Sequence, residues 1–598
     1  MATTPAGPDI VETPPPAMTT SQSPQSQRTV PILQAGGGGL FPAIASRKID
    51  AFSPHILSCL SKIYSSLSRD SGSHTLSKAA TMNFLEEIQN THSTPAVGLS
   101  SDPNGFNDFL AYMASAESSA LAPPSEETRD LTKPISNYFI SSSHNTYLTG
   151  NQLYSDASTE AYKNVLSRSC RCLEIDVWDG DSRESPDEDD EKDRTGIKSS
   201  LRNRLGQKFS DAKAGVINRH DAPPPRPGVP DDLSLPKPSV EEKRREPRVL
   251  HGHTLTREVS FRSVCAAIRD SAFLATNLPI IVSLEVHADL EQQEIMVEIM
   301  KETWAGMLVD ITAQAERDIR HLPSPDQLRG KILIKVKWTP DSKSGESNNP
   351  VDHVVSDSFD ESVTDGKKEK KKKASKTLKA LSELGIYTRA YTFKHFDQPE
   401  ALIPTHVFSL SKQKVTEMHE SHSDSLFAHN RNYLMRVFPE GLRVDSSNVD
   451  PTFLWRQGAQ MVALNWQSCD RGMMLNEGMF AGEEGWVLKP DGYLGTLGGG
   501  EAAMQSQIKR LTLDLTVELI AAQNLPLPPG DKEASRFHPY VKCQLHVDSR
   551  TERSTAEDQK DDGLKWRSKT AKGVDPAFQE TLHFPAVTGV IEKLSFLR

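Results

Sequence analysis

The first regular pattern of apolar residues lies behind Ser53-Pro54, a pair that commonly begins a helix. Apolar side chains then recur every three or four residues, at Ile56, Leu60, Ile63 and Leu67. Similar spacing predicts a second helix from Ser77 to Ile88 and a third near Phe106–Met113. Residues 49–125 are therefore expected to form a small helical region.

The loop after the first predicted helix resembles the calcium-binding loop of an EF-hand only in part. It begins Asp70-Ser-Gly-Ser-His-Thr, but the glycine expected at its sixth position is Thr75 and the glutamate expected at its twelfth is Thr81. These differences remove the residue that allows the sharp turn and the bidentate ligand. We interpret residues 49–125 as EF-hand-like and expect no calcium in this loop.

Short apolar strands alternate with helical segments through the middle of the chain. The predicted strands cover residues 138–141, 170–178, 248–252, 279–286, 331–338, 405–410, 433–438 and 460–466. The predicted helices between the earlier strands cover about 157–166, 260–275 and 290–304. Five strands before and three after a charged segment indicate a split (β/α)8 TIM-type barrel within a multidomain α/β fold.

Three segments lack such patterns. Residues 1–48 are rich in Pro, Ser, Thr, Gln and Gly, which predicts a disordered tail. Residues 181–247 are first acidic and then rich in Pro, which predicts a long insertion that is largely disordered. Residues 340–380 form a charged linker that is acidic at first and ends with the lysine-rich run 367–373. The lysine run fits either a nuclear-localisation signal or a linker that lies on anionic lipid.

The last part of the chain, residues 508–598, changes to a β pattern. Apolar and polar residues alternate in Leu511–Ile520 and His538–Val547 and again near Leu582–Phe584, with Pro-rich turns between them. This pattern predicts a β-sandwich. Because only about five strands fit where a sandwich needs about seven, we expect this domain to be truncated.

Composition limits the class of protein. The chain has 598 residues, 36% hydrophobic residues, a mean hydropathy of -0.50 and a net charge of -11, which argues against a generally basic nucleic-acid-binding protein. Its six cysteines include no CxxC pair and are too sparse for a disulfide framework, so a reducing compartment is expected. No apolar run approaches a membrane span, and the N-terminus lacks a signal-peptide pattern. We expect a cytoplasmic protein that contacts membranes only peripherally.

Two histidine motifs follow predicted strands. His144-Asn145 ends the segment Ser141-Ser-Ser-His-Asn, and His251 begins His-Gly-His. In a barrel of this type, side chains at the carboxyl ends of the strands line the active site. Each motif alone is a weak signal, because a polar histidine in a loop is common.

Three carboxylates lie in predicted buried strands. Glu174 and Asp176 are two residues apart and therefore share one face of their strand, while Glu285 follows the apolar run Pro279-Ile-Ile. Carboxylates held together in a buried place need a cation, and hard divalent ions prefer oxygen ligands. With the amide oxygen of Asn145 they would supply four oxygen donors, and water and substrate would complete the roughly six to eight that calcium takes. A solvent-facing edge strand is the alternative interpretation.

Basic residues occur on the later strands. Lys335 and Lys337 share a face by the same two-residue spacing, and Ser409, Arg436 and Phe438 lie on two strands after the linker. Two ammonium groups and a forked guanidinium beside a metal suit a phosphate-bearing substrate. Lysines on an exposed strand are the alternative. Taken together, the candidate residues favour metal-assisted phosphoryl transfer.

Several of these motifs resemble one known family. The segments SSSHNTYLTGNQL, CRCLEIDVWDG, HGHTLT, RVFPEGLRVDSSN and WRQGAQMVALNWQ are similar to eukaryotic phosphoinositide-specific phospholipase C, of the delta-like type and without an evident pleckstrin-homology domain. The resemblance places the X half of the catalytic barrel at 131–339 and the Y half at 381–494, and it implies a C2-type domain at 508–598.

The resemblance also implies roles for the candidate residues. His144 and His251 would be catalytic, and Asn145, Glu174, Asp176 and Glu285 would bind Ca2+, with Glu174 or Glu285 also acting as the base. Lys335, Lys337, Ser409 and Arg436 would hold the phosphates on the inositol ring, and Phe438 would face the ring. The expected activity is calcium-dependent hydrolysis of phosphatidylinositol 4,5-bisphosphate to diacylglycerol and inositol 1,4,5-trisphosphate through a cyclic phosphate, in intracellular signalling at a membrane surface.

Three departures from the family stand out. Phe438 occupies a position that is usually tyrosine, the insertion at 181–247 is unusually long, and the acidic residues of 341–365 could shield the basic pocket. A catalytically inactive phosphoinositide-binding scaffold is the alternative function. Against it, both catalytic histidines and all four expected calcium ligands are present in the sequence. A third interpretation is another barrel phosphodiesterase, such as a glycerophosphodiester hydrolase. Such an enzyme would need neither the basic residues Lys335, Lys337 and Arg436 nor a C2-type domain, which argues against it.

Overall fold

The computed structural model describes twelve continuous parts of the chain and three isolated residues. These are residues 51–69, 74–89, 97–118, 130–180, 245–252, 254, 256–310, 319–339, 377–440, 443–495, 508–528, 530–547 and 563–598, with Thr91 and Pro95. The predicted tail at 1–48, nearly all of the insertion at 181–247 and most of the linker at 340–380 lie outside these residues, as does His253.

The N-terminal region consists of short helices, as the apolar spacing predicts. They are α1 (Pro54–Leu67), α2 (Lys78–Asn83), a π-helical turn (Phe84–Ile88) and α3 (Phe106–Met113). Ser77 caps α2, because its hydroxyl accepts a hydrogen bond from the Ala80 amide at 3.3 Å. Thr81, which replaces the expected glutamate, is buried and accepts a hydrogen bond from Asn104 Nδ2 at 3.1 Å.

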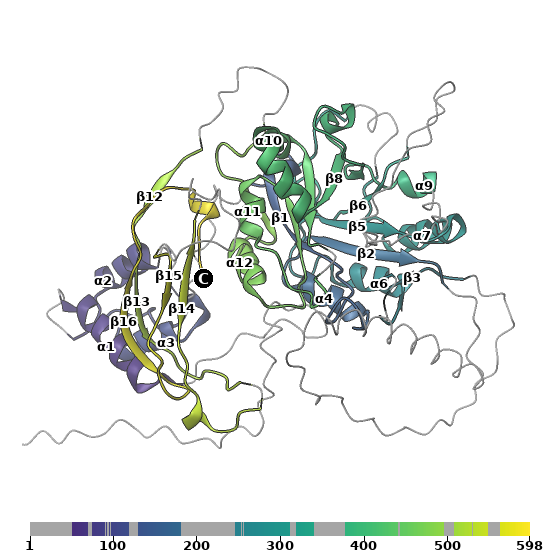
Figure 1. Ribbon diagram of the computed structural model, residues 1–598. Coiled ribbons are helices and arrows are strands. Elements are labelled where there is room, and N and C mark those ends of the chain that lie inside the picture. Colours follow the sequence, from purple (N-terminus) through teal and green to yellow (C-terminus); the bar gives the residue numbers. More distant parts are fainter. Residues whose placement is uncertain are drawn as a thin grey trace, which may run out of the picture.

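The central domain is a closed parallel barrel, on the right of Figure 1. Its strands are β1 (Tyr138–Ser143), β2 (Cys172–Trp178), β5 (Ile280–Val286), β6 (Ile332–Lys337), β7 (Arg389–Ala390), β8 (His406–Ser411), β9 (Leu434–Phe438) and β10 (Met461–Leu464). The barrel closes because β1 pairs in parallel with both β10 and β2. The predicted fold class is therefore confirmed.

Helices cover the outside of the barrel (Figure 1). They are α4 (Thr159–Ser167), α6 (Phe261–Ser271), α7 (Leu290–Thr303), α9 (Lys379–Ser382), α10 (Lys412–Asn432), α11 (Pro451–Arg456) and α12 (Arg471–Phe480). Their buried residues pack against one face of the strands, and Trp304 and Trp455 are among the largest buried side chains of this layer. The outer faces of β2, β5 and β6 are therefore apolar along their length.

The assignment of one barrel strand was wrong. Residues 248–252 do not form a barrel strand, because β3 (Arg248–Val249) pairs antiparallel with the end of β2 and with β4 (Val259–Ser260). The eighth barrel strand is β7, after the linker, so that four strands precede the linker and four follow it. β7 has two residues, too few to show an alternating pattern, and only pairing with β6 and β8 defines it.

Inside the barrel, side-chain chemistry changes along each strand. The inward positions near the strand starts form an apolar cluster that includes Tyr138, Ile140, Cys172, Ile281, Leu333, Val407, Leu434 and Met461. Residues two or four positions later share the same face. On β2 these are Glu174 and Asp176, and on β9 they are Arg436 and Phe438. The barrel interior is thus sealed at its amino end and polar at its carboxyl end.

The C-terminal domain contains seven strands in its described residues, two more than predicted. They are β12 (Leu511–Leu513), β13 (Thr516–Ala521), β14 (Lys542–His546), β15 (Lys565–Arg567), β16 (Ala577–His583), β17 (Val587–Val590) and β18 (Phe596–Leu597). Strands of two or three residues escape detection by alternation. The strands form three small sheets around a core that includes Leu545 and Phe584.

The C-terminal domain contacts both other parts of the chain (Figure 1). Gln523 bridges to the N-terminal helices, since its Oε1 accepts a hydrogen bond from the Ser53 amide at 2.8 Å. On the barrel side, Arg456 donates to the Leu594 carbonyl at 3.3 Å, and Trp455 lies 5.8 Å from Phe596 between ring centres. The three regions therefore pack as one assembly.

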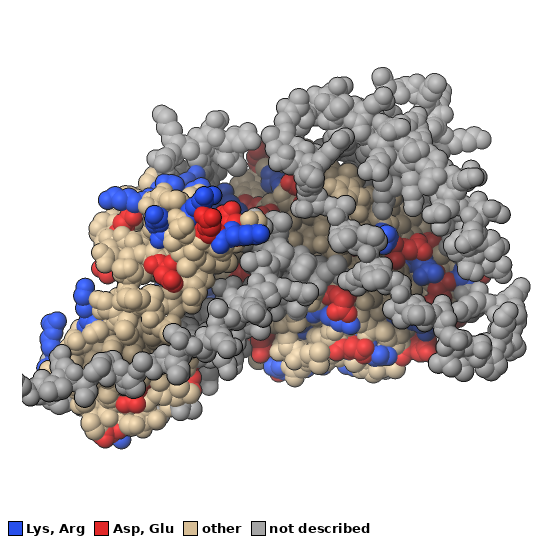
Figure 2. All heavy atoms as spheres, turned by 90° about the horizontal axis from the view of Figure 1, so that it is seen from below, with Lys and Arg blue, Asp and Glu red and all other residues tan. Residues whose placement is uncertain are grey.

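Seen from below, charged side chains of both signs are spread over the barrel, and basic ones gather on the left-hand part of the surface (Figure 2). Among the described residues, no helix has both the length and the apolar character required to cross a membrane.

Candidate functional site

The candidate residues come together at the polar end of the barrel interior. His144 and Asn145 follow β1 directly, and the remaining residues lie on five other strands, toward their carboxyl ends, and in one adjoining loop. They are Glu174 and Asp176 on β2, Glu285 on β5, Lys335 and Lys337 on β6, Ser409 on β8, Arg436 and Phe438 on β9, and His251 after β3. Parallel strands bring side chains that are far apart in the sequence to one edge.

An ion pair crosses the barrel interior between the two halves of the domain. Arg436 Nη2 lies 2.8 Å from Glu174 Oε1, and both side chains are almost fully buried. Burial acts to raise the pKa of the Glu174 carboxyl, but the charges of Arg436 and His144, together with the Asn145 amide, outweigh it and lower that pKa below its usual value. Glu174 is therefore held as a carboxylate.

Oxygen atoms of two candidate residues lie against the hydroxyl of one tyrosine, and a third candidate adjoins them. Tyr147 donates its hydroxyl proton to Asp176 Oδ2 at 2.7 Å, and the same hydroxyl lies 3.2 Å from Asn145 Oδ1. Asn145 also donates its backbone amide to Glu174 Oε2 at 2.6 Å. Its backbone φ of 43° lies in the left-handed region, which asparagine tolerates better than most residues. This conformation turns the Asn145 amide toward Glu174.

The acidic cluster continues onto β5 and β6. Asp176 and Glu285 are direct neighbours in the β2–β5 pairing, and Ser283 is the neighbour of Lys335 in the β5–β6 pairing. Lys335 Nζ donates to Ser283 Oγ at 3.1 Å and lies 3.8 Å from Glu285 Oε1. The Glu285 side chain is 16% exposed and that of Glu174 is 4% exposed, so Glu285 is the more accessible of these two carboxylates.

The two histidines are held in different ways. His144 Nδ1 lies 3.0 Å from Asn465 Oδ1, at the end of β10. His251 is buried, and its backbone amide donates to Thr256 Oγ1 at 3.2 Å. The loop of His251 packs closely on the end of β2, since a Cβ atom added at Gly252 would lie 1.8 Å from the Trp178 ring. Glycine at 252 therefore allows His251 to sit beside the strand that carries Glu174 and Asp176.

The basic and aromatic candidates are not equally buried. Ser409 is the neighbour of Arg436 in the β8–β9 pairing, and its Oγ has no hydrogen-bond partner among the described residues. The Arg436 guanidinium carbon lies 6.0 Å from the Phe438 ring centre. Lys337 is exposed at the end of β6. The structure thus places Lys335 and Arg436 inside the cluster and Lys337 at its rim.

The oxygen atoms of the candidate ligands are of the type that a hard cation binds, but the side chains that carry them are not grouped closely around one point. Carboxylate and amide oxygens of Asn145, Glu174 and Asp176 lie within one hydrogen-bonded group, and Glu285 adjoins Asp176. Calcium takes such oxygen ligands. Within the described residues, however, no three acidic, histidine or cysteine side chains are close enough together to hold a metal ion. Arg436 and Lys335 lie against two of the carboxylates instead.

Sequence reasoning missed the uncharged residues that connect the site. Gln152 accepts a hydrogen bond from Asn145 Nδ2 at 2.7 Å and donates to Ser446 Oγ at 2.8 Å and to Asn465 Oδ1 at 3.3 Å. Tyr147 was also missed. Asn465 directly follows a barrel strand, so the rule that identifies His144 after β1 could have identified Asn465 after β10.

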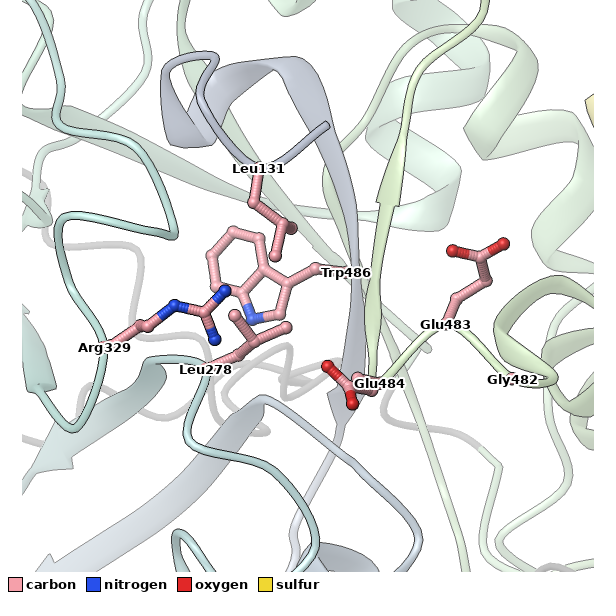
Figure 3. A pocket seen from close by; sticks show the side chains of 7 residues that line it. All are labelled: Leu131, Leu278, Arg329, Gly482, Glu483, Glu484 and Trp486. Carbon is pink, nitrogen blue, oxygen red and sulfur yellow. The ribbon is translucent and has the colours of Figure 1, made fainter. Parts of the chain in front are cut away.

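A cavity of about 300 Å3 lies away from this cluster (Figure 3). It is lined by residues that precede their strands or lie on β11 (Trp486–Leu488), among them Leu131, Leu278, Arg329, Glu484 and Trp486. The starts of barrel strands lie at the end opposite to the candidate site. The cavity therefore belongs to the sealed end of the barrel.

Family models match four regions of the chain. The model "Phosphatidylinositol-specific phospholipase C, X domain" matches residues 131–338, and the corresponding Y-domain model matches residues 381–492. An EF-hand model matches residues 55–124, and a C2 domain model matches residues 513–597.

Curated relatives and a solved structure agree with these matches. The chain is 31% identical over 490 residues to 1-phosphatidylinositol 4,5-bisphosphate phosphodiesterase 1 of Candida albicans, covering 74% of this chain and 40% of that protein. It is 32% identical over 461 residues to the delta-1 phosphodiesterase of Homo sapiens, covering 74% of this chain and 52% of that protein. The chain spans about half the length of the curated relatives it matches.

The fold is similar to the crystal structure of L. pealei PLC21, with a TM-score of 0.56, 21% identity, and coverage of 90% of this chain and 62% of that chain. The X and Y matches flank the linker in the same order as the two halves of the barrel. This chain therefore belongs to the phosphoinositide-specific phospholipase C family, with relatives of the delta type.

Proposed function

We propose that this protein is a calcium-dependent phospholipase C that hydrolyses phosphatidylinositol 4,5-bisphosphate to diacylglycerol and inositol 1,4,5-trisphosphate. The observation that carries this proposal is the polar carboxyl end of the barrel interior, where Glu174, Asp176 and Glu285 lie beside buried Arg436 and Lys335. Such a combination suits a substrate whose phosphates need cationic partners and whose reacting hydroxyl needs a base. The names of the relatives agree with this substrate.

Asn145, Glu174, Asp176 and Glu285 would hold Ca2+. When bound, calcium would supply a positive charge that stabilises the phosphate and makes a nearby hydroxyl more acidic. Binding would require Glu174 to share its carboxylate with the cation and with Arg436, which contacts one of its two oxygens. The charges of Arg436 and Lys335 would partly offset the repulsion between the carboxylates in the absence of the ion.

The protein groups can carry the proton transfers. Glu285, the more accessible of the two carboxylates that could act as a base, takes the proton of the inositol 2-hydroxyl. The oxygen of that hydroxyl then attacks phosphorus, and His144 stabilises the charge on the phosphoryl oxygens. His251 gives a proton to the diacylglycerol oxygen as the phosphorus–oxygen bond breaks, which leaves a cyclic inositol phosphate. Water opens this phosphate with the proton transfers reversed.

Lys335, Lys337, Ser409 and Arg436 would bind the phosphates on the inositol ring. The buried and unpartnered Ser409 Oγ beside Arg436 offers one more polar group for this purpose. Phe438 would present its ring to the inositol. Because phenylalanine lacks the hydroxyl of the usual tyrosine, it contributes an apolar contact only.

The membrane is the expected partner surface, and the protein would act in the cytoplasm in intracellular signalling. Although the net charge is -11, the exposed side chains of Lys542 on β14 and of Lys565 and Arg567 on β15 are basic. Within the described residues these three side chains form no ion pair, so they could approach anionic lipid. Peripheral binding of this kind needs no membrane-spanning helix.

An inactive phosphoinositide-binding scaffold is the second candidate. The observation in its favour is that the described acidic and histidine side chains do not form a metal-binding group as they stand. A scaffold would bind phosphoinositide vesicles through Lys335 and Arg436 without releasing any product.

The test is release of water-soluble inositol phosphates from mixed vesicles that contain phosphatidylinositol 4,5-bisphosphate, with calcium raised from chelated to micromolar. The proposal predicts calcium-dependent release of the trisphosphate by the wild type and none by His144→Ala. Vesicle binding without release would support the scaffold, and vesicles of phosphatidylinositol or its 4-phosphate would measure the preference for the second ring phosphate.

A further inference from the structure

Two motifs of the Y half have no role in the chemistry proposed so far. They are the residues around Ser446 and Asn448 and the residues around Asn465, which follow β9 and β10. All three side chains lie at the polar end of the barrel, where the buried Asn465 contacts a histidine from the X half. They are therefore candidates for positioning the catalytic groups.

Asn465 Oδ1 faces two nitrogen atoms. His144 Nδ1 lies at 3.0 Å, and Gln152 Nε2 donates from 3.3 Å. An amide oxygen can only accept hydrogen bonds, so the contact with His144 requires a proton on Nδ1. Because Nδ1 is engaged by Asn465, Nε2 is the ring nitrogen that can contact the substrate. A third group that orients a catalytic histidine is a general feature of such sites.

Asn465 is itself held rigidly. Its backbone amide donates to Asn448 Oδ1 at 2.6 Å, and its backbone carbonyl accepts from Asn448 Nδ2 at 3.1 Å. Asn448 is in turn anchored by Asp470, whose Oδ2 accepts from the Asn448 amide at 2.6 Å. The backbone of Asn465 is therefore fixed on both sides before any substrate arrives.

Gln152 links this group to the other side of the site. Its Oε1 accepts from Asn145 Nδ2 at 2.7 Å, so that Asn145 Oδ1 is left facing Tyr147. Its Nε2 donates to both Ser446 and Asn465. One buried glutamine thus sets the orientation of Asn145 from the X half against residues from the Y half.

We propose that Asn465 is a positioning residue that holds His144 in the form with a proton on Nδ1 and directs Nε2 toward the reacting phosphate, and that Gln152 couples this position to that of Asn145. The proposal rests on the proposed function for its effect on turnover. The protonated nitrogen of His144 can be measured without any activity. The Y half then supplies part of the catalytic geometry, besides the groups that bind ring phosphates.

The test compares Asn465→Leu, which removes the acceptor at similar volume, with Asn465→Asp, which retains an acceptor. Asn476→Leu is the matched control, because Asn476 is also buried in the Y half but lies on α12 away from the site. For Asn465→Leu we expect a kcat about 10- to 100-fold lower, with KM changed less than about 3-fold. Asn465→Asp should recover most of the kcat, and Asn476→Leu should leave it near the wild-type value.

The second readout is the 15N spectrum of histidine-labelled protein, with the His144 signals assigned from His144→Gln. The wild type should show a protonated Nδ1 that loses this signature in Asn465→Leu and keeps it in Asn465→Asp. An unchanged signature in Asn465→Leu, or an equal loss of kcat in Asn476→Leu, would overturn the proposal. If the wild type releases no inositol phosphate, the proposed function fails, while the spectrum still decides the positioning of His144.

Discussion

Arg436 Nη2 on β9 lies 2.8 Å from Glu174 Oε1 on β2, and this contact joins the two halves of the barrel across its interior. Neither side chain has appreciable contact with solvent. Removing one partner of such a pair leaves a charge buried without compensation, which costs more than the pair itself contributes.

Arg436→Met should therefore destabilise the barrel by roughly 3–5 kcal/mol and abolish trisphosphate release. Urea unfolding and the vesicle assay measure the two effects. The double variant Arg436→Met with Glu174→Gln removes both charges and should recover most of the stability but none of the activity. If the double variant is as unstable as the single one, the ion pair does not account for the loss.

Asp176→Asn should weaken calcium binding without unfolding the protein. The change removes one negative charge from the cluster but keeps the oxygen that accepts the Tyr147 hydroxyl. We expect the calcium concentration for half-maximal release to rise at least about 10-fold. Asp424→Asn, on the exposed surface of α10, is the matched control and should not shift the calcium curve. A shift of equal size in both variants would argue against calcium at Asp176.

Phe438→Tyr should improve binding of the headgroup. Phe438 is partly exposed near Arg436, so an added hydroxyl can reach water or a ring phosphate. One hydrogen bond to a charged group is worth roughly 1.5–3 kcal/mol, and solvent competition reduces the gain. The KM for phosphatidylinositol 4,5-bisphosphate should fall a few-fold while kcat stays similar. An unchanged KM would mean that the ring of residue 438 does not reach the headgroup.

The buried His429 predicts a stability change at mildly acidic pH. The pKa of His429 is lowered to about 4 in the folded state, chiefly by burial; the hydrogen bond to Asn430 acts against this shift, and the charge of the nearby Lys489 contributes to it. Between the folded value and the usual value near 6.5, the unfolded chain binds the extra proton, so stability decreases as pH falls through this window. The full effect is roughly 3 kcal/mol.

Urea unfolding from pH 4 to pH 7 measures this dependence. His429→Phe, which keeps an aromatic ring among Phe396, Phe408 and Tyr433, should show a shallower decrease in stability toward acid than the wild type. Parallel curves for the two proteins would mean that carboxylates alone determine the acid sensitivity.

Several features could be predicted from the sequence, for physical reasons that act locally. Apolar spacing identifies α1 and α3, and apolar runs identify β2 and β5, because buried helices and strands need a continuous apolar face. The two-residue spacing of Glu174 and Asp176 indicates a shared face because strand side chains alternate. These arguments use only residues that are close together in the chain.

Other features depend on pairing between distant segments. β7 exists as a strand only because β6 and β8 lie on either side of it, and β3 turns away from the barrel because it pairs antiparallel with β2. Arg436, which pairs with Glu174, and Asn465, which contacts His144, come from the other half of the barrel. No local pattern shows that a neutral residue such as Asn465 accepts a hydrogen bond from a histidine.

The sequence by itself determined most of the order of elements, the split barrel and the identity of the charged residues at the strand ends, because periodicity acts within single segments, and its motifs indicated the family by resemblance. Only the tertiary structure decided that Arg436 pairs with Glu174, that Glu285 is the more open carboxylate and that Asn465 and Gln152 hold the site together. Closure of the barrel brings these residues within hydrogen-bonding distance, and hydrogen bonds and ion pairs depend on distance in space rather than distance along the chain.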